Sequence, residues 1–163
     1  MKISSVLISA TCVLAAGGCI NSTSTVSGRV GEPTDIGEQV VTMQELECGD
    51  VQAESDGERW EYLGCEAELA IVNQGTSDLV LEAKDQIAVS GEKEHGGWAM
   101  FPDDESDVAE RLARTLTGEY DLTVATIEAN DTGRLRLNFQ LPVGTEVERV
   151  KLTIDRIVVN FSV

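Results

Sequence analysis

Basic residues and histidine are scarce in this sequence. Lysine and arginine number 12 in 163 residues, against 29 aspartates and glutamates, and the formal net charge is −17. Such a chain repels nucleic acid and anionic membrane surfaces, which excludes binding through the neutralisation of phosphates. The single histidine, His95, stands in KEHGGW without a nucleophile motif, so a Ser-His-Asp or Cys-His mechanism is not indicated. We interpret His95 as a solvated loop residue and predict neither enzymatic activity nor a cofactor.

Metal-binding patterns are scarce as well. The four cysteines form no CxxC pair, and His95 lies far along the chain from Cys48 and Cys65, which argues against a metal or redox role. The acidic run DDESD, Asp103 to Asp107, is of the kind that hard cations prefer. An EF-hand loop counted from Asp103 would nevertheless lack its glycine and its final glutamate. We predict no metal site and keep weak calcium binding as the alternative.

Long apolar runs are also missing, and the clearest short one lies at the N-terminus. Residues 1–18 carry Lys2 and then an apolar stretch that falls short of the ~20 residues of a membrane-spanning helix, which is typical of an export signal. Small residues, Ala16 to Gly18, precede Cys19 as a signal peptidase requires. This pattern resembles the lipobox of prokaryotic lipoproteins, which implies that Cys19 is the lipidated first residue of the mature chain. Plain secretion with a free or paired Cys19 is the alternative.

The remaining chain divides into a tether and one domain. Residues 19–34 are rich in Ser, Thr and Gly and too polar to bury much surface, so we predict a flexible tether. Residues 35–163 are long enough for one domain with its own core. Their acidic residues are scattered and resemble the solvated surfaces of proteins from salt-adapted archaea. We expect such a fold to gain stability in 1 M salt, where the Debye length is about 3 Å.

From Ile36 onward the apolar residues mostly alternate with a period of two, which predicts strands. In RLRLNFQLP, Arg134 to Pro142, Leu and Phe occupy one face and Arg, Asn and Gln the other. At the C-terminus the phase slips between Ile154 and Ile157, which predicts a bulge. Residues 106–118 instead show helical spacing between a Ser N-cap and a final Gly. We therefore predict a mainly β fold, an antiparallel immunoglobulin-like β-sandwich with one short connecting helix.

Two stretches carry a resemblance to a known family. LAIVNQGTSDLVL, Leu69 to Leu81, has a strand that ends in Asn before a polar turn, and Gly133, Leu137, Phe139 and Pro142 mark a strand near the C-terminus. Together they resemble the telokin-like, immunoglobulin-fold domain of unknown function found in prokaryotic lipoproteins. The resemblance implies a fold and an extracytoplasmic location, and it brings no reaction with it.

Cys48 and Cys65 flank the stretch GDVQAESDGERWEYLG. Its Asp56-Gly57 is a strong signal for a hairpin turn, and a hairpin centred there places the two cysteines opposite each other. In an exported protein such a pair is expected to be oxidised, and closing the loop would contribute about 3 kcal/mol. Because Cys65 shares a strand face with apolar residues, we expect the bridge to be buried on the core side.

The few aromatic residues, 4% of the chain, suggest a contact surface. Trp60 and Tyr62 lie on the strand side opposite Cys65, and Trp98 and Phe101 lie in what we interpret as a Gly-flanked loop. If exposed, these four could form a contact patch for a partner protein or glycan; alternatively they pack beneath the loops.

Three Asn-x-Ser/Thr sequons offer sites for glycosylation. They begin at Asn21, Asn130 and Asn160, and Asn130 in ANDTG is the best acceptor because it resembles a surface turn. Taken together, the sequence predicts an extracytoplasmic protein anchored to the cell membrane through a lipid. Its domain would act by non-catalytic binding or structural support in the cell envelope. The alternatives are an accessory subunit of a solute-uptake or extracytoplasmic enzyme complex and, less favoured, a stand-alone hydrolase.

Overall fold

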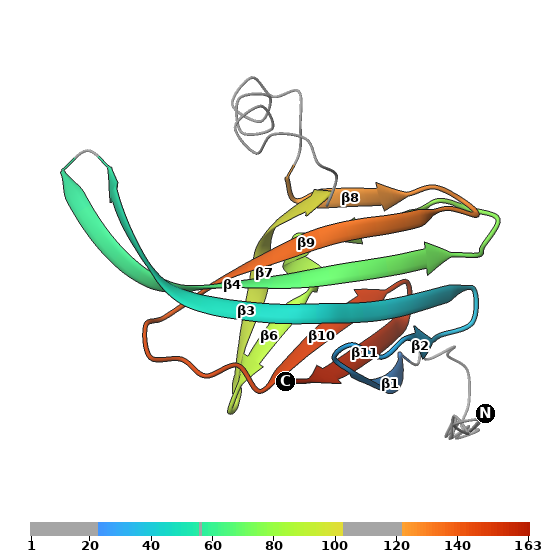
Figure 1. Cartoon of the computed structure of the whole chain (residues 1–163), viewed down its shortest axis with the longest axis horizontal. Coiled ribbons are helices and arrows are strands. Elements are labelled where there is room, and N and C mark those ends of the chain that lie inside the picture. Colours follow the sequence, from blue (N-terminus) through green and yellow to red (C-terminus); the bar gives the residue numbers. More distant parts are fainter. Residues whose placement is uncertain (1–22, 56, 103–121) are drawn as a thin grey trace, which may run out of the picture.

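The computed structural model describes residues 23–55, 57–102 and 122–163, and most of these lie in strands (Figure 1). The nine-stranded sheet runs in the order β1 (Ser24–Arg29), β11 (Ile157–Ser162), β10 (Arg149–Ile154), β6 (Ile87–Ser90), β7 (Lys93–Pro102), β9 (Thr132–Leu141), β4 (Glu58–Asn73), β3 (Gln39–Ser55) and β2 (Thr34–Asp35). A second sheet pairs β5 (Leu79–Glu82) with β8 (Val124–Ile127), and η1 (Ala83–Asp85) is a single 3-10 turn. The predicted mainly β fold is confirmed.

Strand β7 divides the large sheet into two layers. Its residues 93–96 pair with β6, residues 97–102 pair with β9, and the register shifts between Gly97 and Ala99. The two layers pack their apolar faces together, and the edge strands β1 and β2 approach each other, so the sandwich is nearly closed. The buried side chains come from both layers and include Val41, Met43, Leu69, Leu137, Phe139, Val150, Leu152, Val159 and Phe161. The sheet is mixed rather than purely antiparallel, because β1 runs parallel to β11.

The folded region begins within residues 19–34, so the predicted extent of the tether is wrong. Strand β1 lies inside that range, and the Ser24 amide donates to the Arg156 carbonyl at 3.1 Å. A Cβ placed on Gly28 would lie 2.6 Å from Cε1 of Phe161, so the glycine permits close packing rather than flexibility. The polar composition predicted a flexible segment, but backbone pairing with β11 and packing of the Val26 side chain form a strand here.

A buried amide fixes the turn after β4. The Asn73 side chain, fully buried, donates through Nδ2 to the carbonyls of Ser77 (2.9 Å), Ile127 (3.2 Å) and Glu128 (3.1 Å). Its Oδ1 accepts from the Gly75 amide at 3.1 Å. The strand-ending asparagine therefore ties the polar turn to the end of β8.

The segment around Trp98 is a strand, and the predicted loop containing Trp98 and His95 is wrong. Backbone from the η1 turn crosses β7 at this point, and the Gly97 amide donates to the Gln86 carbonyl at 2.8 Å. A Cβ on Gly97 would lie 2.6 Å from the Ala83 carbonyl oxygen. The glycines therefore allow another backbone to cross the strand, a role that Gly also has in strands generally.

The shift in apolar periodicity between Ile154 and Ile157 corresponds to a hairpin turn, so the predicted bulge is wrong. Strand β10 ends at Ile154, β11 begins at Ile157, and these two residues are cross-strand partners. Asp155 takes a φ of 52°, a left-handed conformation that aspartate tolerates. The two-residue turn thus keeps the apolar residues of both strands on the core side.

Several predicted features lie outside the described residues. These are the export signal with Cys19 and Asn21, the helix at 106–118 and the acidic run Asp103 to Asp107. Within the ranges that the structure describes, no helix has both the length and the apolar character needed to cross a membrane.

Candidate functional site

The turn end of the β3–β4 hairpin projects beyond the other strands as a curved ribbon (Figure 1). We call residues 49–64 the arm. Strand β9 pairs with β4 only between Leu63 and Val72, so residues 58–62 have β3 as their one partner strand among the described residues. Beyond Leu63 the arm is therefore a two-stranded extension of the sandwich.

The turn of the arm has the predicted register. Ser55 pairs with Glu58, which leaves positions 56 and 57 as a two-residue turn, and Gly57 has a φ of 81°. A positive φ is what such tight hairpin turns require, and Gly adopts it without steric cost.

A disulfide closes the base of the arm. Cys48 and Cys65 are cross-strand partners with Cα atoms 4.1 Å apart, so the predicted pairing is confirmed. Cys65 is only 2% exposed and lies opposite Phe139 of β9, whereas Cys48 is exposed. The expected burial on the core side is therefore wrong for Cys48, because pairing of β3 with β2 ends at Val41 and leaves this part of β3 at an open edge.

The arm carries its aromatic side chains on one face. Tyr62 pairs with Val51, and Trp60 follows on the same face toward the tip, where it is 45% exposed. A Cβ on Gly64 would lie 3.0 Å from Cγ2 of Val51 and 3.6 Å from Cε2 of Tyr62, whereas a Cβ on Gly49 would meet open space. Because Gly64 has no side chain, the side chains of Tyr62 and Val51 can pack against its backbone.

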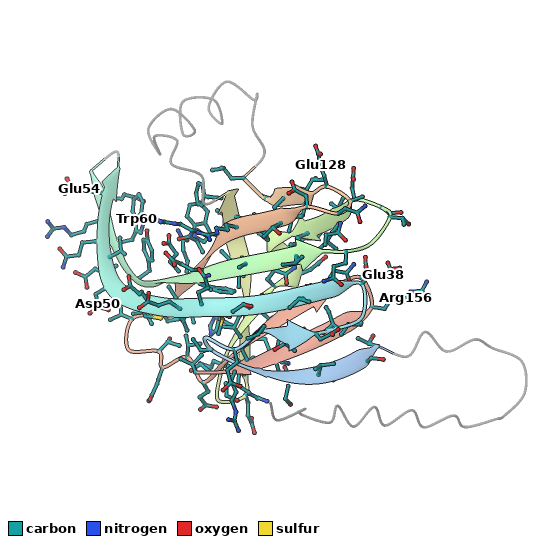
Figure 2. All side chains as sticks on the ribbon, turned by 45° about the vertical axis from the view of Figure 1, so that its right-hand side comes forward. Glu38, Asp50, Glu54, Trp60, Glu128 and Arg156 are labelled. Atoms are coloured by element: carbon teal, nitrogen blue, oxygen red, sulfur yellow. A yellow bond between two sulfur atoms is a disulfide. The ribbon has the colours of Figure 1, made fainter. Side chains whose placement is uncertain are left out.

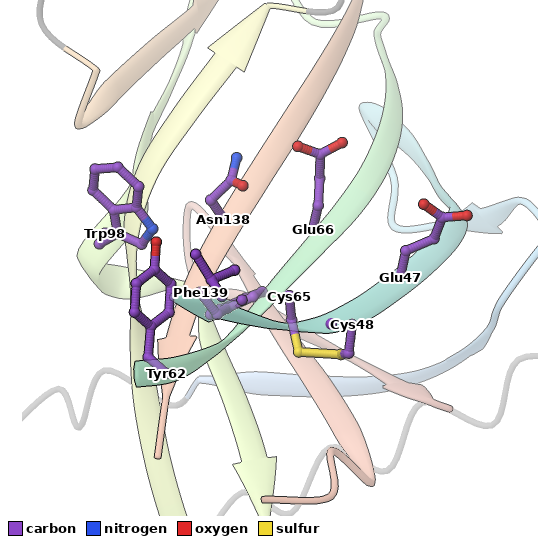
Figure 3. Close-up of a pocket in the computed structure, with 11 residues that line it drawn as sticks. Glu47, Cys48, Tyr62, Cys65, Glu66, Trp98, Asn138 and Phe139 are labelled. Carbon is purple, nitrogen blue, oxygen red and sulfur yellow. A yellow bond between two sulfur atoms is a disulfide. The ribbon is translucent and has the colours of Figure 1, made fainter. Parts of the chain in front are cut away.

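Strand β7 brings a second aromatic side chain to the base of the arm. The register shift between Gly97 and Ala99 leaves Trp98 without a directly opposed residue on β9, and its side chain is 47% exposed. Tyr62 and Trp98 line an open groove of about 440 Å³ together with Asn138 and Phe139, and we call it the crook groove. Figure 3 shows the hydroxyl end of Tyr62 directed toward the indole of Trp98.

The crook groove combines negative charge with a hydrogen-bond donor that has no acceptor. Glu47 and Glu66 are cross-strand partners that both line it, and Glu66 also forms an ion pair with Arg136 at 3.5 Å. Nδ2 of Asn138 is buried and has no hydrogen-bond partner. None of the described residues that line the groove is a lysine or arginine. A ligand entering here meets aromatic rings, carboxylates and an amide.

The structure separates the four predicted contact residues. Tyr62 and Trp98 line the crook groove, Trp60 lies beside it on the arm, and Phe101 lies farther along β7, opposite Arg136 and outside the groove. Three other residues of the groove, Asn138, Glu47 and Glu66, were not predicted from the sequence. Two patterns could have identified them: the strict alternation of β9 assigns Asn138 to the outer face, and the disulfide register places Glu47 opposite Glu66.

Other predicted residues lie away from this groove. His95 is half-buried on β7, and its Nε2 is buried without a hydrogen-bond partner, so it is not a solvated residue. Asn130 is exposed in the turn before β9 with a φ of 61°, as expected of a surface acceptor. Asn160 is half-buried on β11, and its Oδ1 is buried, which makes it the poorer acceptor. Glycosylation of either asparagine stays a prediction.

Two exposed ion pairs shift the pKa values of Glu94 and Lys84. A hydrogen bond from Lys151, reinforced by its charge, lowers the pKa of Glu94. In the same way a hydrogen bond to Glu82 raises the pKa of Lys84. Across residues 23–55, 57–102 and 122–163, no group of three His, Cys, Asp or Glu side chains is arranged to hold a metal ion.

Comparison with known family models and with curated proteins finds no match. Solved structures do match. An uncharacterized β-sandwich protein from Clostridium difficile 630 is 14% identical with a TM-score of 0.52, over 85% of this chain and 93% of that one. A "putative lipoprotein", ycdA from Bacillus subtilis, is 16% identical with a TM-score of 0.52, over 80% of this chain and 38% of that one. A functionally unknown protein from Listeria monocytogenes EGD-e is 11% identical with a TM-score of 0.52, over 81% and 82%. At these identities the likeness establishes the β-sandwich fold alone.

Proposed function

We propose that this chain is a lipid-anchored, extracytoplasmic binding protein of the cell envelope, with an immunoglobulin-like, telokin-like sandwich as scaffold and the crook groove as its binding surface. The role is non-catalytic. The observation that carries the proposal is the open groove at the base of the disulfide-linked arm, lined by Tyr62 of the arm and Trp98 of β7.

The placement of the tryptophans supports a binding role. The chain has two tryptophans, Trp60 and Trp98, and both are nearly half exposed at the arm or its base. Exposed large aromatics that cluster on a charged surface are typical of contact sites, because their burial by a partner supplies much of the binding energy.

The disulfide and the position of the start of β1 support the proposed location. Disulfides persist in oxidising compartments, in agreement with the export signal. Strand β1 begins five residues after Cys19, a distance of at most about 18 Å. The start of β1 lies beside Arg156, and Figure 2 shows Arg156 and the arm residue Glu54 at opposite ends of the molecule. An anchor at Cys19 would therefore direct the arm away from the membrane.

The anchor is tested by expressing the full chain and its Cys19→Ser variant in a prokaryotic host that processes lipoproteins. After fractionation we expect the wild type with the membranes and the variant in the medium. A wild-type chain found in the medium, or a variant that stays with the membranes, would contradict lipid anchoring.

The binding role is tested by offering the immobilised domain to a random peptide display library and to a polysaccharide array. We expect a ligand that the wild type enriches and the double variant Tyr62→Ala/Trp98→Ala does not. Phe101→Ala is the matched control, since it removes an aromatic side chain outside the groove and should retain the ligand. If no ligand is enriched, or if the wild type and the double variant enrich the same ligands equally, the groove is not the binding surface.

A further inference from the structure

We propose that the crook groove binds an extended, cationic polypeptide segment, with an arginine or lysine side chain against the rings of Tyr62 and Trp98 and near the carboxylates of Glu47 and Glu66. This ligand class rests on the proposed function of the groove.

The charge of the groove favours a cation. Glu47 and Glu66 face each other across β3 and β4, and two like charges in such a pair destabilise a sheet. Arg136 offsets the charge of Glu66, but no cationic group of the described residues lies within ion-pair distance of Glu47. A bound cation would relieve this repulsion, so binding and stability of the arm would be coupled.

The rings of Tyr62 and Trp98 add a contact that salt does not remove. The faces of tyrosine and tryptophan attract ammonium and guanidinium groups, and the planar guanidinium of arginine also stacks on them. Long-range attraction between charges is screened within about 3 Å at 1 M salt, whereas a desolvated contact with a ring persists. The combination of rings and carboxylates therefore selects a cation even at high ionic strength.

The unpaired amide and the free strand edge favour a polypeptide over a small amine. Nδ2 of Asn138 needs an acceptor, which a peptide carbonyl supplies and an ammonium group does not. Beyond Leu63 the outer edge of β4 has no partner strand among the described residues, so alternate backbone groups of residues 58–62 can pair with an added strand. A sugar could satisfy Asn138 and stack on the rings, but it would leave the repulsion at Glu47 in place.

The charge of the whole chain argues against a second copy as the occupant. Two copies would bring net charges of −17 together. An acidic sandwich with an acidic groove is complementary to a basic partner, and the same field would speed the encounter at low salt.

The test uses Trp98 as the reporter in a Trp60→Phe chain, which then contains a single tryptophan. The probe is a short synthetic peptide of alternating arginine and threonine. Its matched control carries citrulline, which has nearly the shape of arginine without the charge. We expect saturable changes in Trp98 fluorescence with the arginine peptide and binding weaker by roughly tenfold or more with the citrulline peptide. Arginine amide alone should bind more weakly than the peptide.

Two charge variants separate a site from general attraction to an acidic protein. Glu47→Gln should lower the affinity for the arginine peptide by roughly tenfold. Glu54→Gln removes a charge of the same sign near the arm tip and should leave that affinity unchanged. Equal losses from both variants, or equal binding of the arginine and citrulline peptides, would overturn the cation site. If arginine amide bound with the same affinity as the arginine peptide, the inference that the ligand is a polypeptide would be overturned.

A response of Trp98 to a neutral oligosaccharide but not to the arginine peptide would also overturn this inference. If that response disappears in Tyr62→Ala, the groove is a glycan site and the proposed binding function stands. The proposed function fails separately, when no ligand from the peptide library or the polysaccharide array depends on Tyr62 and Trp98.

Discussion

The body of the sandwich and the arm contain the same two strands in opposite surroundings. Near Met43 and Leu69, strands β3 and β4 lie within the sheet and bury their inner side chains almost completely. Beyond Leu63 the same antiparallel ladder continues toward the turn, but there its two strands have only each other as partners among the described residues. The difference teaches that neighbouring strands, rather than intrinsic strand propensity, decide which part of a hairpin is core and which is available for contact.

An isolated two-stranded ribbon is marginally stable in water. The arm therefore depends on its attachment to the body, and the Cys48–Cys65 bridge stands at the boundary between the two. Phe139 of β9 lies beside Cys65 on the body side, while Tyr62 and Trp60 follow on the arm side. Changes on the two sides of this boundary should have different consequences.

The largest contrast should come from removing one large side chain on each side of the boundary. Phe139 is 1% exposed, so Phe139→Ala should lower the free energy of unfolding by about 3–5 kcal/mol through lost burial and a cavity. Trp60→Ala, at a side chain 45% exposed, should cost less than about 1 kcal/mol. Urea unfolding of both variants measures the difference. Comparable losses would mean that the arm belongs to the cooperative core.

The next largest effect concerns the boundary itself. Replacing both cysteines, Cys48→Ser/Cys65→Ser, should reduce the free energy of unfolding by about 3 kcal/mol, because the bridge closes a loop with a sequence separation of 17. Amide hydrogen exchange should accelerate more in residues 49–64 than in β9. Wild-type protein under reducing conditions should reproduce the result. Equal acceleration in arm and body would show that the bridge does not support the arm in particular.

The two glycines at the base of the arm provide a finer comparison. Gly64→Ala would press on Val51 and Tyr62 and should cost about 1 kcal/mol, with a shift in Trp98 fluorescence as Tyr62 moves. Gly49→Ala points into open space and should be neutral, or stabilising by up to about 1 kcal/mol, because alanine restricts the unfolded chain. Melting curves and emission spectra measure both. If the two variants behave alike, packing over Gly64 does not set the shape of the groove.

The sequence predicted the arm better than it predicted the limits of the domain. Asp56-Gly57 and the two cysteines gave the register of the hairpin, since a two-residue turn leaves one pairing that brings the cysteines together. The alternation of β9 correctly separated its buried from its outward residues. The bulge between Met43 and Glu45 was not predicted; it shifts the register of β3 against β4 on the body side of the disulfide.

Other features escaped prediction because they depend on contacts between distant segments. The Ser and Thr residues of β1 are typical of a linker, but pairing with β11 makes them a strand. Gly97 is typical of a loop, but here it lies in a strand where backbone from the η1 turn crosses. The crook groove is a further case. Trp98 and Tyr62 lie far apart in the sequence, and their meeting depends on the order β7-β9-β4 in the sheet.

The smallest expected effect lies in the body, at the ion pair between Glu94 of β7 and Lys151 of β10. Lys151 lowers the pKa of Glu94, so the pair contributes its full stability at pH values above the ordinary carboxyl pKa. That contribution is lost as the pH falls through the lowered pKa of Glu94, where the carboxylate becomes protonated. Both side chains are partly or largely exposed, and solvent screening keeps the effect small. Glu94→Gln should therefore be slightly less stable than wild type near neutral pH and indistinguishable from it in acid.

Urea unfolding from about pH 7 to about pH 3 measures this difference. Glu92→Gln is the matched control, because it removes a carboxylate from the neighbouring turn and should not reproduce the pH-dependent difference. If the difference in the free energy of unfolding between Glu94→Gln and wild type persists or widens in acid, a stabilising role of the ion pair would be contradicted. The contrast with the groove is then direct: in the body a lysine already neutralises its glutamate, whereas Glu47 at the base of the arm has no such cation within the described part of the chain, and a basic ligand would supply it.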